Sequence, residues 1–187
     1  MKKIRCEWCE KDDLYRNYHD KEWGRPVYDD ATIFEFLVLE SFQAGLSWYT
    51  ILKKRESFRK VFDEFDYHTI AEYDDAKVEA LMNDSGIIRN RLKILATINN
   101  AQKFMEVQKE FGSFSRYIWN FVGGKPIQNH PKTLKEVPAT TEVSDALAKD
   151  LKKRGFKFLG STVVYAHMQA TGMVNDHVEE CWVNGIE

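Results

Sequence analysis

Four side chains that bind transition metals stand near the two ends of the chain. They are Cys6 and His19 at the N-terminal end, and His177 and Cys181, four positions apart, at the C-terminal end. Two cysteines and two histidines complete a tetrahedral zinc shell, which leaves no position open for catalysis. If residues 177–181 are helical, their i, i+4 spacing places both side chains on one face. The pattern therefore predicts a structural zinc ion that joins the termini and adds its binding energy to folding.

The spacing alone leaves other interpretations open. The four residues can be unrelated: a buried cysteine, a capping histidine and a surface pair near a frayed end. Cys6 and Cys9 form a Cys-x-x-Cys motif, so Cys9 could replace Cys6 as a ligand. The remaining histidines have no neighbours of ligand type and are expected at the surface or in helix packing: His68, His130 and His167.

Glu40 is a carboxylate late in the most apolar helical stretch, directly after residues 36–39. Helical spacing places it with Phe36 and Leu37, where a carboxylate is costly unless it is paired, protonated or reserved for a ligand. Aromatic residues are dense on both sides of it in the sequence, at Trp8, Tyr15, Tyr18, Trp23 and Trp48. Rings around one carboxylate indicate a pocket for a flat, electron-poor or cationic ligand, and a flipped nucleobase is such a ligand. The alternative is that the rings are core residues and Glu40 accepts a hydrogen bond from a backbone amide.

Residues 152–162 join a basic helix end to a new helix start through two glycines, Gly155 and Gly160. Backbone N–H groups and a helix N-terminus converge in such a turn, which suits a phosphate, and nearby cations add a salt-dependent attraction. An ordinary helix connection, in which Lys and Arg stabilise the helix dipole, is the alternative.

A second basic segment, residues 86–93, repeats this pattern more weakly. A glycine precedes a helix start that carries Arg89 and Arg91, and cations there oppose the helix dipole unless an external anion is bound. The same arginines could instead pair with Asp84 or other acids.

The composition describes one globular protein of 187 residues. Hydrophobic residues make up 43% and charged residues 30%, and 27 Lys+Arg face 29 Asp+Glu, for a formal charge of −2. This balance excludes wholesale disorder and argues against coating nucleic acid by bulk charge, so a nucleic-acid site must be a local basic strip. No apolar run approaches the ~20 residues of a membrane span, and the first residues lack the apolar core of a secretory signal. We therefore expect no membrane contact and a cytoplasmic protein, in which three cysteines make a disulfide framework unexpected.

Apolar spacing is helical almost throughout, which predicts an all-α fold in a single domain, residues 1–187. A buried helix starts at Ala31 and ends near Gly45, and Ser47 caps a second helix that ends after residues 53–55. Further helices are predicted at Asp74–Asn83, Asn90–Phe111, Phe114–Val122, Ser144–Arg154 and Thr162–Thr171.

Two segments depart from the helical pattern. Gly123–Pro138 holds three of the four prolines and is predicted to be a long irregular connection, which could separate two helical lobes with a cleft between them. Phe156–Leu159 alternates in hydropathy and could form a short strand, although no partner strand is evident.

Taken together, these residues resemble the DNA-3-methyladenine glycosylase I family, which belongs to the helix-hairpin-helix superfamily of base-excision repair enzymes. The matching stretches follow the family order from residue 5 to about residue 181. They are Arg5–Trp8, Tyr18–Gly24, Leu39–Trp48, Gly86–Arg89, Lys152–Gly160 and Val174–His177. The resemblance implies the helix-hairpin-helix glycosylase fold, with a zinc site that joins the N- and C-termini.

The resemblance also implies roles for individual residues. The zinc ligands fall on Cys6, His19, His177 and Cys181, and Cys9 is spare. The base-reading glutamate falls on Glu40, the stacking rings on Tyr18 and Trp48, and other pocket walls on Trp8, Tyr15 and Trp23. The DNA-clamping hairpin falls on Gly155, Lys157, Gly160 and Ser161. Phe42 stands where many relatives are expected to carry a polar residue, and this departure is expected to alter the pocket rim.

The implied activity is hydrolysis of the N-glycosidic bond of 3-methyladenine in alkylated double-stranded DNA, with free 3-methyladenine as product. The base is expected to flip into the aromatic pocket, where Glu40 accepts a hydrogen bond and favours its cationic form. Ser161, rather than a Schiff-base lysine, precedes Thr162, so we expect no strand cleavage. Asp176 adjoins a predicted ligand and is assigned a supporting or structural role.

Two functions from other classes compete with this interpretation. A non-catalytic DNA-binding module would need the hairpin and the zinc but not an acid buried among rings, so Glu40 discriminates between them. A zinc-dependent hydrolase is disfavoured because four protein ligands close the metal shell. We expect a monomer, and the sequence does not decide whether 3-methylguanine is also a substrate.

Overall fold

Side-chain caps start most of the helices, and the capping residues are types that mark helix starts in a sequence. Asp29 and Ser47 each accept a hydrogen bond from the backbone N–H three residues further on. The same cap is made by Asp12, Asp74, Asn90, Ser113 and Thr141. Such caps pair backbone donors that a helix leaves unsatisfied in its first turn.

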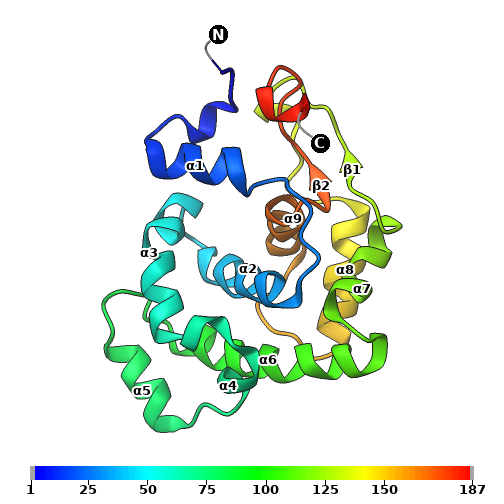
Figure 1. Ribbon diagram of the computed structural model, residues 1–187. Helices are drawn as coiled ribbons and strands as arrows, with labels where there is room; N and C mark the ends of the chain where they lie inside the picture. The colour runs from blue at the N-terminus through cyan, green and yellow to red at the C-terminus, as the bar shows by residue number, and fades with distance from the viewer. Residues whose placement is uncertain (1–2, 186–187) are drawn as a thin grey trace.

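The computed structural model describes residues 3–185 of the chain. The α-helices in this range are α1 (Asp13–Lys21), α2 (Asp30–Gln43), α3 (Trp48–Val61), α4 (Tyr67–Ala71), α5 (Asp75–Asn83), α6 (Arg91–Phe111), α7 (Phe114–Trp119), α8 (Glu142–Lys153) and α9 (Ser161–Ala170) (Figure 1). Two short strands, β1 (Ile127–Gln128) and β2 (Val174–Asn175), pair in parallel.

Helix α2 is the centre of the core. It is apolar around its whole circumference, and its buried residues run from Ile33 to Phe42. A helix of this kind has to be covered on every side. It contacts α3, α6, α7 and α9, which surround it in Figure 1. Glu40 is therefore carried into the interior by its own helix.

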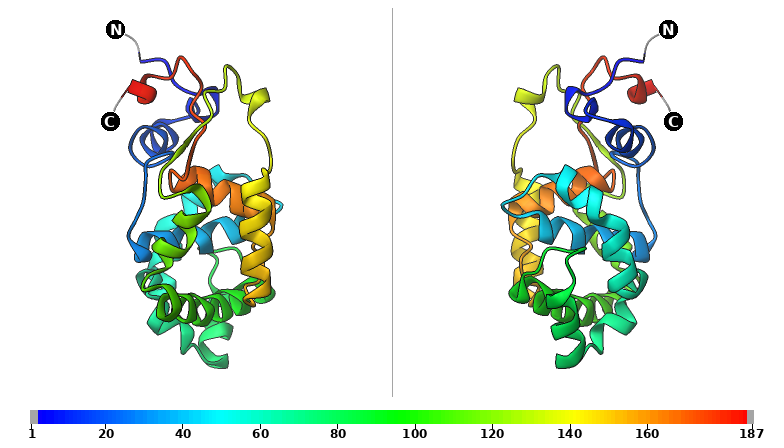
Figure 2. Two further views of the ribbon diagram at one scale, coloured as in Figure 1. Left: turned by 90° about the vertical axis from the view of Figure 1, so that its right-hand side faces the viewer. Right: turned by 90° about the vertical axis from the view of Figure 1, so that its left-hand side faces the viewer.

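The two ends of the described chain lie together at one end of the molecule (Figure 2). The backbone N–H of Trp182 donates to the carbonyl of Ile4 over 2.9 Å. Strand β1 lies in the irregular connection between α7 and α8, and its pairing with β2 brings that connection against the C-terminal segment. Glu179 adds a backbone hydrogen bond to Pro131.

The predicted helical fold class is confirmed. The helices predicted over residues 31–45, 74–83, 90–111, 144–154 and 162–171 all form, with ends shifted by one or two residues. Helix α3 continues to Val61, past the predicted end at residues 53–55. Its basic end does not terminate the helix, because Arg55 is buried and paired with Glu22 and Glu35 at 2.7 Å each.

Three local predictions were wrong or incomplete. Phe156–Leu159 is not a strand: its backbone turns, with Phe158 at a φ of +58°, and the Asn100 side chain holds Lys157. Helices α1 and α4 were not predicted, because α1 is mostly polar and α4 has only five residues. In the described range, no helix combines the length and apolar character that crossing a bilayer requires.

Candidate ligand pocket and metal centre

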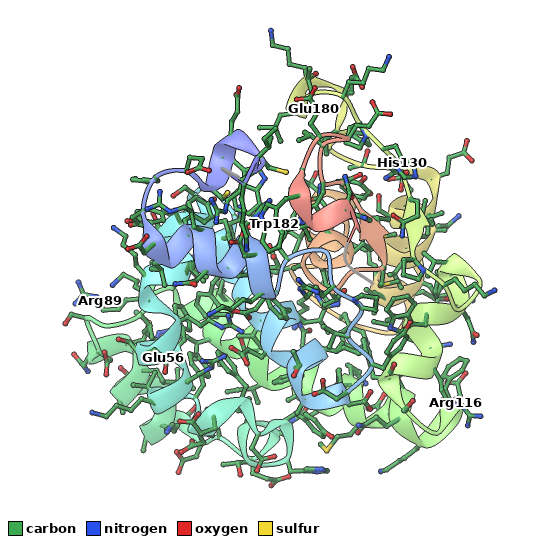
Figure 3. All side chains as sticks on the ribbon, turned by 45° about the horizontal axis from the view of Figure 1, so that its top comes forward. Glu56, Arg89, Arg116, His130, Glu180 and Trp182 are labelled. Atoms are coloured by element: carbon green, nitrogen blue, oxygen red, sulfur yellow. The ribbon has the colours of Figure 1, made fainter. Side chains whose placement is uncertain are left out.

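Three of the predicted metal ligands meet in the interior. One ligand atom from each of Cys6, His19 and Cys181 lies within 4.8 Å of the others, and all three residues are buried. His19 is carried by α1, Cys6 precedes a short 3-10 turn, and Cys181 precedes the last turn of the described chain. The N- and C-terminal segments meet beside Trp182, whose indole N–H donates to Asp20 over 3.3 Å (Figure 3).

His177 adjoins this cluster. Its ring centre lies 4.9 Å from that of His19, and its buried Nε2 atom has no hydrogen-bond partner among residues 3–185. Its Nδ1 atom contacts Asn175 Oδ1 at 2.8 Å, just as Nδ1 of His19 contacts Asp20 Oδ1 at 2.9 Å. Both histidines therefore use Nδ1 for orientation and leave Nε2 for a ligand.

The packing around His177 explains a glycine of the N-terminal motif. Gly24 has a φ of +75°, and a Cβ atom there would lie 2.6 Å from Cε1 of His177. A side chain at this position would displace the imidazole, so the site requires glycine.

Residues 177–181 are not helical, so the condition on which the i, i+4 spacing depends is not met. The segment turns instead, with the N–H of Cys181 donating to the Val178 carbonyl over 2.8 Å. The turn brings Cys181 to the cluster without helical spacing. Cys9 is buried outside the cluster, where its thiol donates to the Cys6 carbonyl at 3.1 Å.

The protonation states suit a metal. The hydrogen bond between the two thiols lowers the pKa of Cys181 and, together with burial, raises that of Cys6, which favours the thiolate at Cys181. Burial lowers the pKa of His177 to about 4, which keeps the imidazole neutral at pH 7. Thiolate sulfur, neutral imidazole and an orphaned buried nitrogen are the donors that zinc takes. The residues present therefore fit a zinc ion.

The six predicted pocket residues line one cavity of about 230 Å³. They are Trp8, Tyr15, Tyr18, Trp23, Glu40 and Trp48. Four further residues line the same cavity and were not predicted: Gln43, Leu134, Ala166 and Gln169. Gln43 lies within a matching stretch of the sequence, whereas Leu134 and the α9 residues reach the cavity only through the tertiary fold.

The rings of the cavity contact one another. Trp8 meets Tyr15 and Trp23 edge to face, at 4.8 and 5.0 Å between ring centres. Tyr18 and Trp48 lie 5.4 Å apart and are tilted by 44°. A base held between two parallel rings needs them roughly 7 Å apart, at two contact distances. Tyr18 and Trp48 therefore form one continuous wall in this structure.

Glu40 is 3% exposed, and its Oε2 atom has no hydrogen-bond partner among residues 3–185. Burial raises its pKa to about 8, so the empty pocket holds a neutral carboxyl at pH 7. The indole N–H of Trp48 is also buried and finds no acceptor within the described part of the chain. Unpaired buried polar groups are costly, and in a cavity they indicate a ligand that supplies the missing partners.

Helix α1 connects the cluster of Cys6, His19 and Cys181 to the cavity. Tyr18 lines the cavity, whereas the next residue, His19, belongs to the cluster. Trp8 lies two residues after Cys6, with its ring centre 5.3 Å from that of His19. The cluster therefore anchors two rings of the cavity wall.

The predicted hairpin is the turn between α8 and α9. Gly155 has a φ of +92°, and Asn100 of α6 bonds both the N–H and the carbonyl of Lys157, each at 2.9 Å. Gly160 precedes α9 without a side-chain cap, so the helix start is open to an external acceptor. The Ser161 hydroxyl is engaged by Ser144 at 2.8 Å and also donates to Asp145, which leaves only its backbone N–H for a phosphate.

In the second basic segment, residues 86–93, two of the basic side chains pair with groups of the protein itself. Arg91 pairs with Glu79 at 2.6 Å, which is the alternative that the sequence left open. Lys93 is buried and donates to the carbonyls of Phe42 and Ala44 at 3.1 and 3.3 Å, where it caps the end of α2. The side chain of Arg89 is exposed (Figure 3).

One expectation about a single residue changes. Phe42 does not alter the pocket rim: it is fully buried and packs on Phe58 at 5.0 Å between ring centres. The Asp176 carboxylate accepts hydrogen bonds from three side chains, and Asn175 rather than Asp176 contacts Nδ1 of His177. His167 is a buried helix-packing residue, within the range expected for it.

Comparison with known proteins gives one consistent result. The model of the methyladenine glycosylase family matches residues 8–184. DNA-3-methyladenine glycosylase from Haemophilus influenzae is 49% identical over 177 residues, which cover 95% of this chain and 96% of the relative. DNA-3-methyladenine glycosylase 1 from Escherichia coli is also 49% identical, over 95% of each chain. The solved structure of 3-methyladenine DNA glycosylase I from Staphylococcus aureus, which concerns 3-methyladenine recognition, superposes with a TM-score of 0.92 at 37% identity, over 96% of this chain and 95% of that one.

Proposed function

The chain belongs to the methyladenine glycosylase family and is a DNA glycosylase, and we propose that it hydrolyses the N-glycosidic bond of 3-methyladenine in alkylated double-stranded DNA. One observation carries the proposal: Glu40 is a buried carboxyl whose Oε2 atom has no partner among residues 3–185, and it lies in a cavity walled by aromatic rings. A cavity of about 230 Å³ has room for a purine but not for a nucleotide with its flanking backbone, so the base has to leave the duplex stack to enter it.

Glu40 selects the damaged base by charge. Its carboxyl is neutral in the empty cavity, because burial raises its pKa to about 8. Methylation at N3 makes the purine a cation while it is still bound to deoxyribose, and this cation stabilises the ionised carboxylate. The proton of Glu40 goes to solvent, and the carboxylate then accepts a hydrogen bond from the base edge. Undamaged adenine is neutral and offers no compensation for the buried charge.

The aromatic wall adds to this selection. Tyr18 and Trp48 present contiguous ring surface, and a cationic base gains more from a ring face than a neutral base does. We propose that the base lies against this wall rather than between the two rings. Trp8, Tyr15 and Trp23 also line the cavity.

The chemical step is hydrolysis without strand cleavage. The bond from the base nitrogen to C1′ of the sugar breaks, and its electron pair stays with the base, which neutralises the cation, so that the base leaves directly as neutral 3-methyladenine. Water adds to C1′ and releases its proton to solvent. No lysine precedes Thr162, since Ser161 stands there, so no Schiff base with the sugar is expected at that position.

Zinc is proposed as the structural cofactor, held by Cys6, His19, His177 and Cys181. A bound ion with four protein ligands supplies a cross-link and charge neutralisation, not an open coordination position. The residues of the cluster keep α1 against the C-terminal segment and so hold Tyr18 in the cavity wall. The hairpin at Gly155–Gly160, with Lys157, is proposed to bind the DNA backbone.

The test is release of free base from methylated duplex DNA, measured by chromatography. Wild type should release 3-methyladenine, and Glu40→Gln should lower kcat/KM at least 100-fold, because an amide cannot become the counterion of the cationic base. Glu56→Gln, at a side chain that is 82% exposed, is the control and should leave the rate unchanged. DNA binding without base release by wild type would favour a binding module. Full activity of Glu40→Gln would overturn the role of Glu40.

A further inference from the structure

Gln169 lines the cavity from α9 and has no part in the mechanism above. Its side-chain amide offers one acceptor, Oε1, and two N–H groups on Nε2, so its orientation decides what it can recognise. That orientation is set by Asp176, whose Oδ2 atom accepts a hydrogen bond from Gln169 Nε2.

Asp176 is a buried hub with 1% exposure. Its Oδ2 atom accepts hydrogen bonds from the Tyr165 hydroxyl at 2.6 Å and from Gln169 Nε2 at 2.8 Å. Its Oδ1 atom accepts from Asn129 Nδ2 at 2.7 Å. Two donors from α9 and one from the connection that follows β1 hold the carboxylate in one position.

This hub determines which way the Gln169 amide faces. The carboxylate needs a donor, so Nε2 must be the atom beside Asp176, and the reverse orientation would place two acceptors together. The Oε1 atom then lies on the other arm of the amide, and no residue in the described range donates to it. Gln169 lines the cavity and its Nε2 atom is held by Asp176, so its Oε1 atom, which accepts no hydrogen bond among residues 3–185, is available to a ligand there.

We propose that Gln169 Oε1 accepts a hydrogen bond from the exocyclic amine of the flipped base and thereby selects 6-amino over 6-oxo purines. This inference rests on the proposed function. An adenine-type base carries an N–H donor at this position, whereas a hypoxanthine- or guanine-type base carries a carbonyl oxygen, which would face the Gln169 oxygen with no hydrogen between them. Asp176 is the positioning residue that keeps the acceptor aimed at the base.

The test compares two free bases that differ at one position, 3-methyladenine and 3-methylhypoxanthine. Binding is followed by quenching of the cavity tryptophans in wild type and in Gln169→Leu. In wild type the Kd of the oxo base should be at least tenfold higher than the Kd of the amino base. In Gln169→Leu this ratio should fall about tenfold, because the oxygen of the oxo base no longer faces the Gln169 oxygen. An unchanged preference in Gln169→Leu would overturn the inference.

Two further variants separate this role from a loss of folding. Gln102→Leu removes a glutamine that bonds the Ala71 carbonyl away from the cavity, and its preference should equal that of wild type. Asp176→Asn can donate toward Gln169 and lets the amide reverse, so its preference should fall while 3-methyladenine still binds. Failure of wild type to bind 3-methyladenine or to release it from DNA would instead count against the proposed function, so the two failures are distinguishable.

Discussion

Glu40 is a single residue whose burial destabilises the fold when it is ionised and at the same time favours binding of a cationic base. Its helix buries it among apolar neighbours, and no side chain of the described chain pairs with Oε2. Burial raises its pKa from the ordinary value to about 8. The Glu40 carboxyl is therefore neutral at pH 7 without a ligand, and it ionises when a cationic ligand binds beside it.

This pKa predicts a pH-dependent stability. Between pH 4.5, the ordinary value, and about 8, the unfolded chain releases the Glu40 proton while the folded chain keeps it. The contribution of Glu40 to the free energy of unfolding therefore falls as pH rises through this window. Glu40→Gln should be stabilised relative to wild type by on the order of 4 kcal/mol more at pH 8.5 than at pH 4.5.

Urea unfolding of both proteins at the two pH values measures this difference. Taking the difference between the proteins cancels the titration of all groups that the substitution leaves alone. A gap between wild type and variant that does not change with pH would mean that Glu40 titrates normally in the folded chain.

At the scale of elements, the hairpin between α8 and α9 owes its shape to α6. Asn100 is buried on α6 and forms two hydrogen bonds with the backbone of Lys157. Its neighbour Asn99 donates to the Gly155 carbonyl at 2.9 Å. Two side chains of one helix thus hold a turn that is about 57 residues away in the sequence, and no local pattern in the turn specifies that contact.

Asn100→Ala should loosen this turn. The KM for methylated duplex DNA should rise about tenfold, because the two lost hydrogen bonds no longer hold the backbone N–H groups of the hairpin in place. Binding of free 3-methyladenine should stay within twofold of wild type, since the cavity lies elsewhere. Asn83→Ala, which removes an exposed asparagine bonded within α5, is the matched control. Equal losses of DNA and free-base affinity would mean that Asn100 supports the fold rather than the hairpin.

At the scale of the whole molecule, the cluster of Cys6, His19 and Cys181 connects the two ends of the chain and stands directly behind the cavity wall. The arrangement in Figure 2 places the N- and C-terminal segments at one end of the molecule, away from the α5 end. A metal that binds there stabilises the folded state because its ligands come together only when the chain is folded.

Purified protein should contain one zinc ion per chain by elemental analysis. Cys181→Ser should lose the metal and lower Tm by roughly 10 °C, the shift expected from a loss of about 3–5 kcal/mol in a chain of this size. Cys9→Ser is the control, because Cys9 is buried outside the cluster and serine can keep its hydrogen bond to the Cys6 carbonyl. An active protein that contains no zinc, or a zinc-free Cys181→Ser variant with unchanged Tm, would contradict the proposal.

The sequence by itself determined the features that depend on residue type and local spacing. Capping residues mark the starts of α2, α3, α5 and α6. Apolar spacing identifies α2 as a buried helix, and this places Glu40 in the protein interior. The matching stretches of the sequence identified four candidate metal ligands and five aromatic residues of a pocket. The structure places the five rings in one cavity and three of the four candidate ligands in one cluster.

Only the tertiary structure decided the features that depend on contacts between distant segments. A turn rather than a helix presents Cys181, Tyr18 and Trp48 touch instead of leaving a slot, and Gln169 reaches the cavity from α9. Local propensity covers a few neighbouring residues, whereas these arrangements are set by long-range packing and hydrogen bonds, which no short pattern in the sequence encodes.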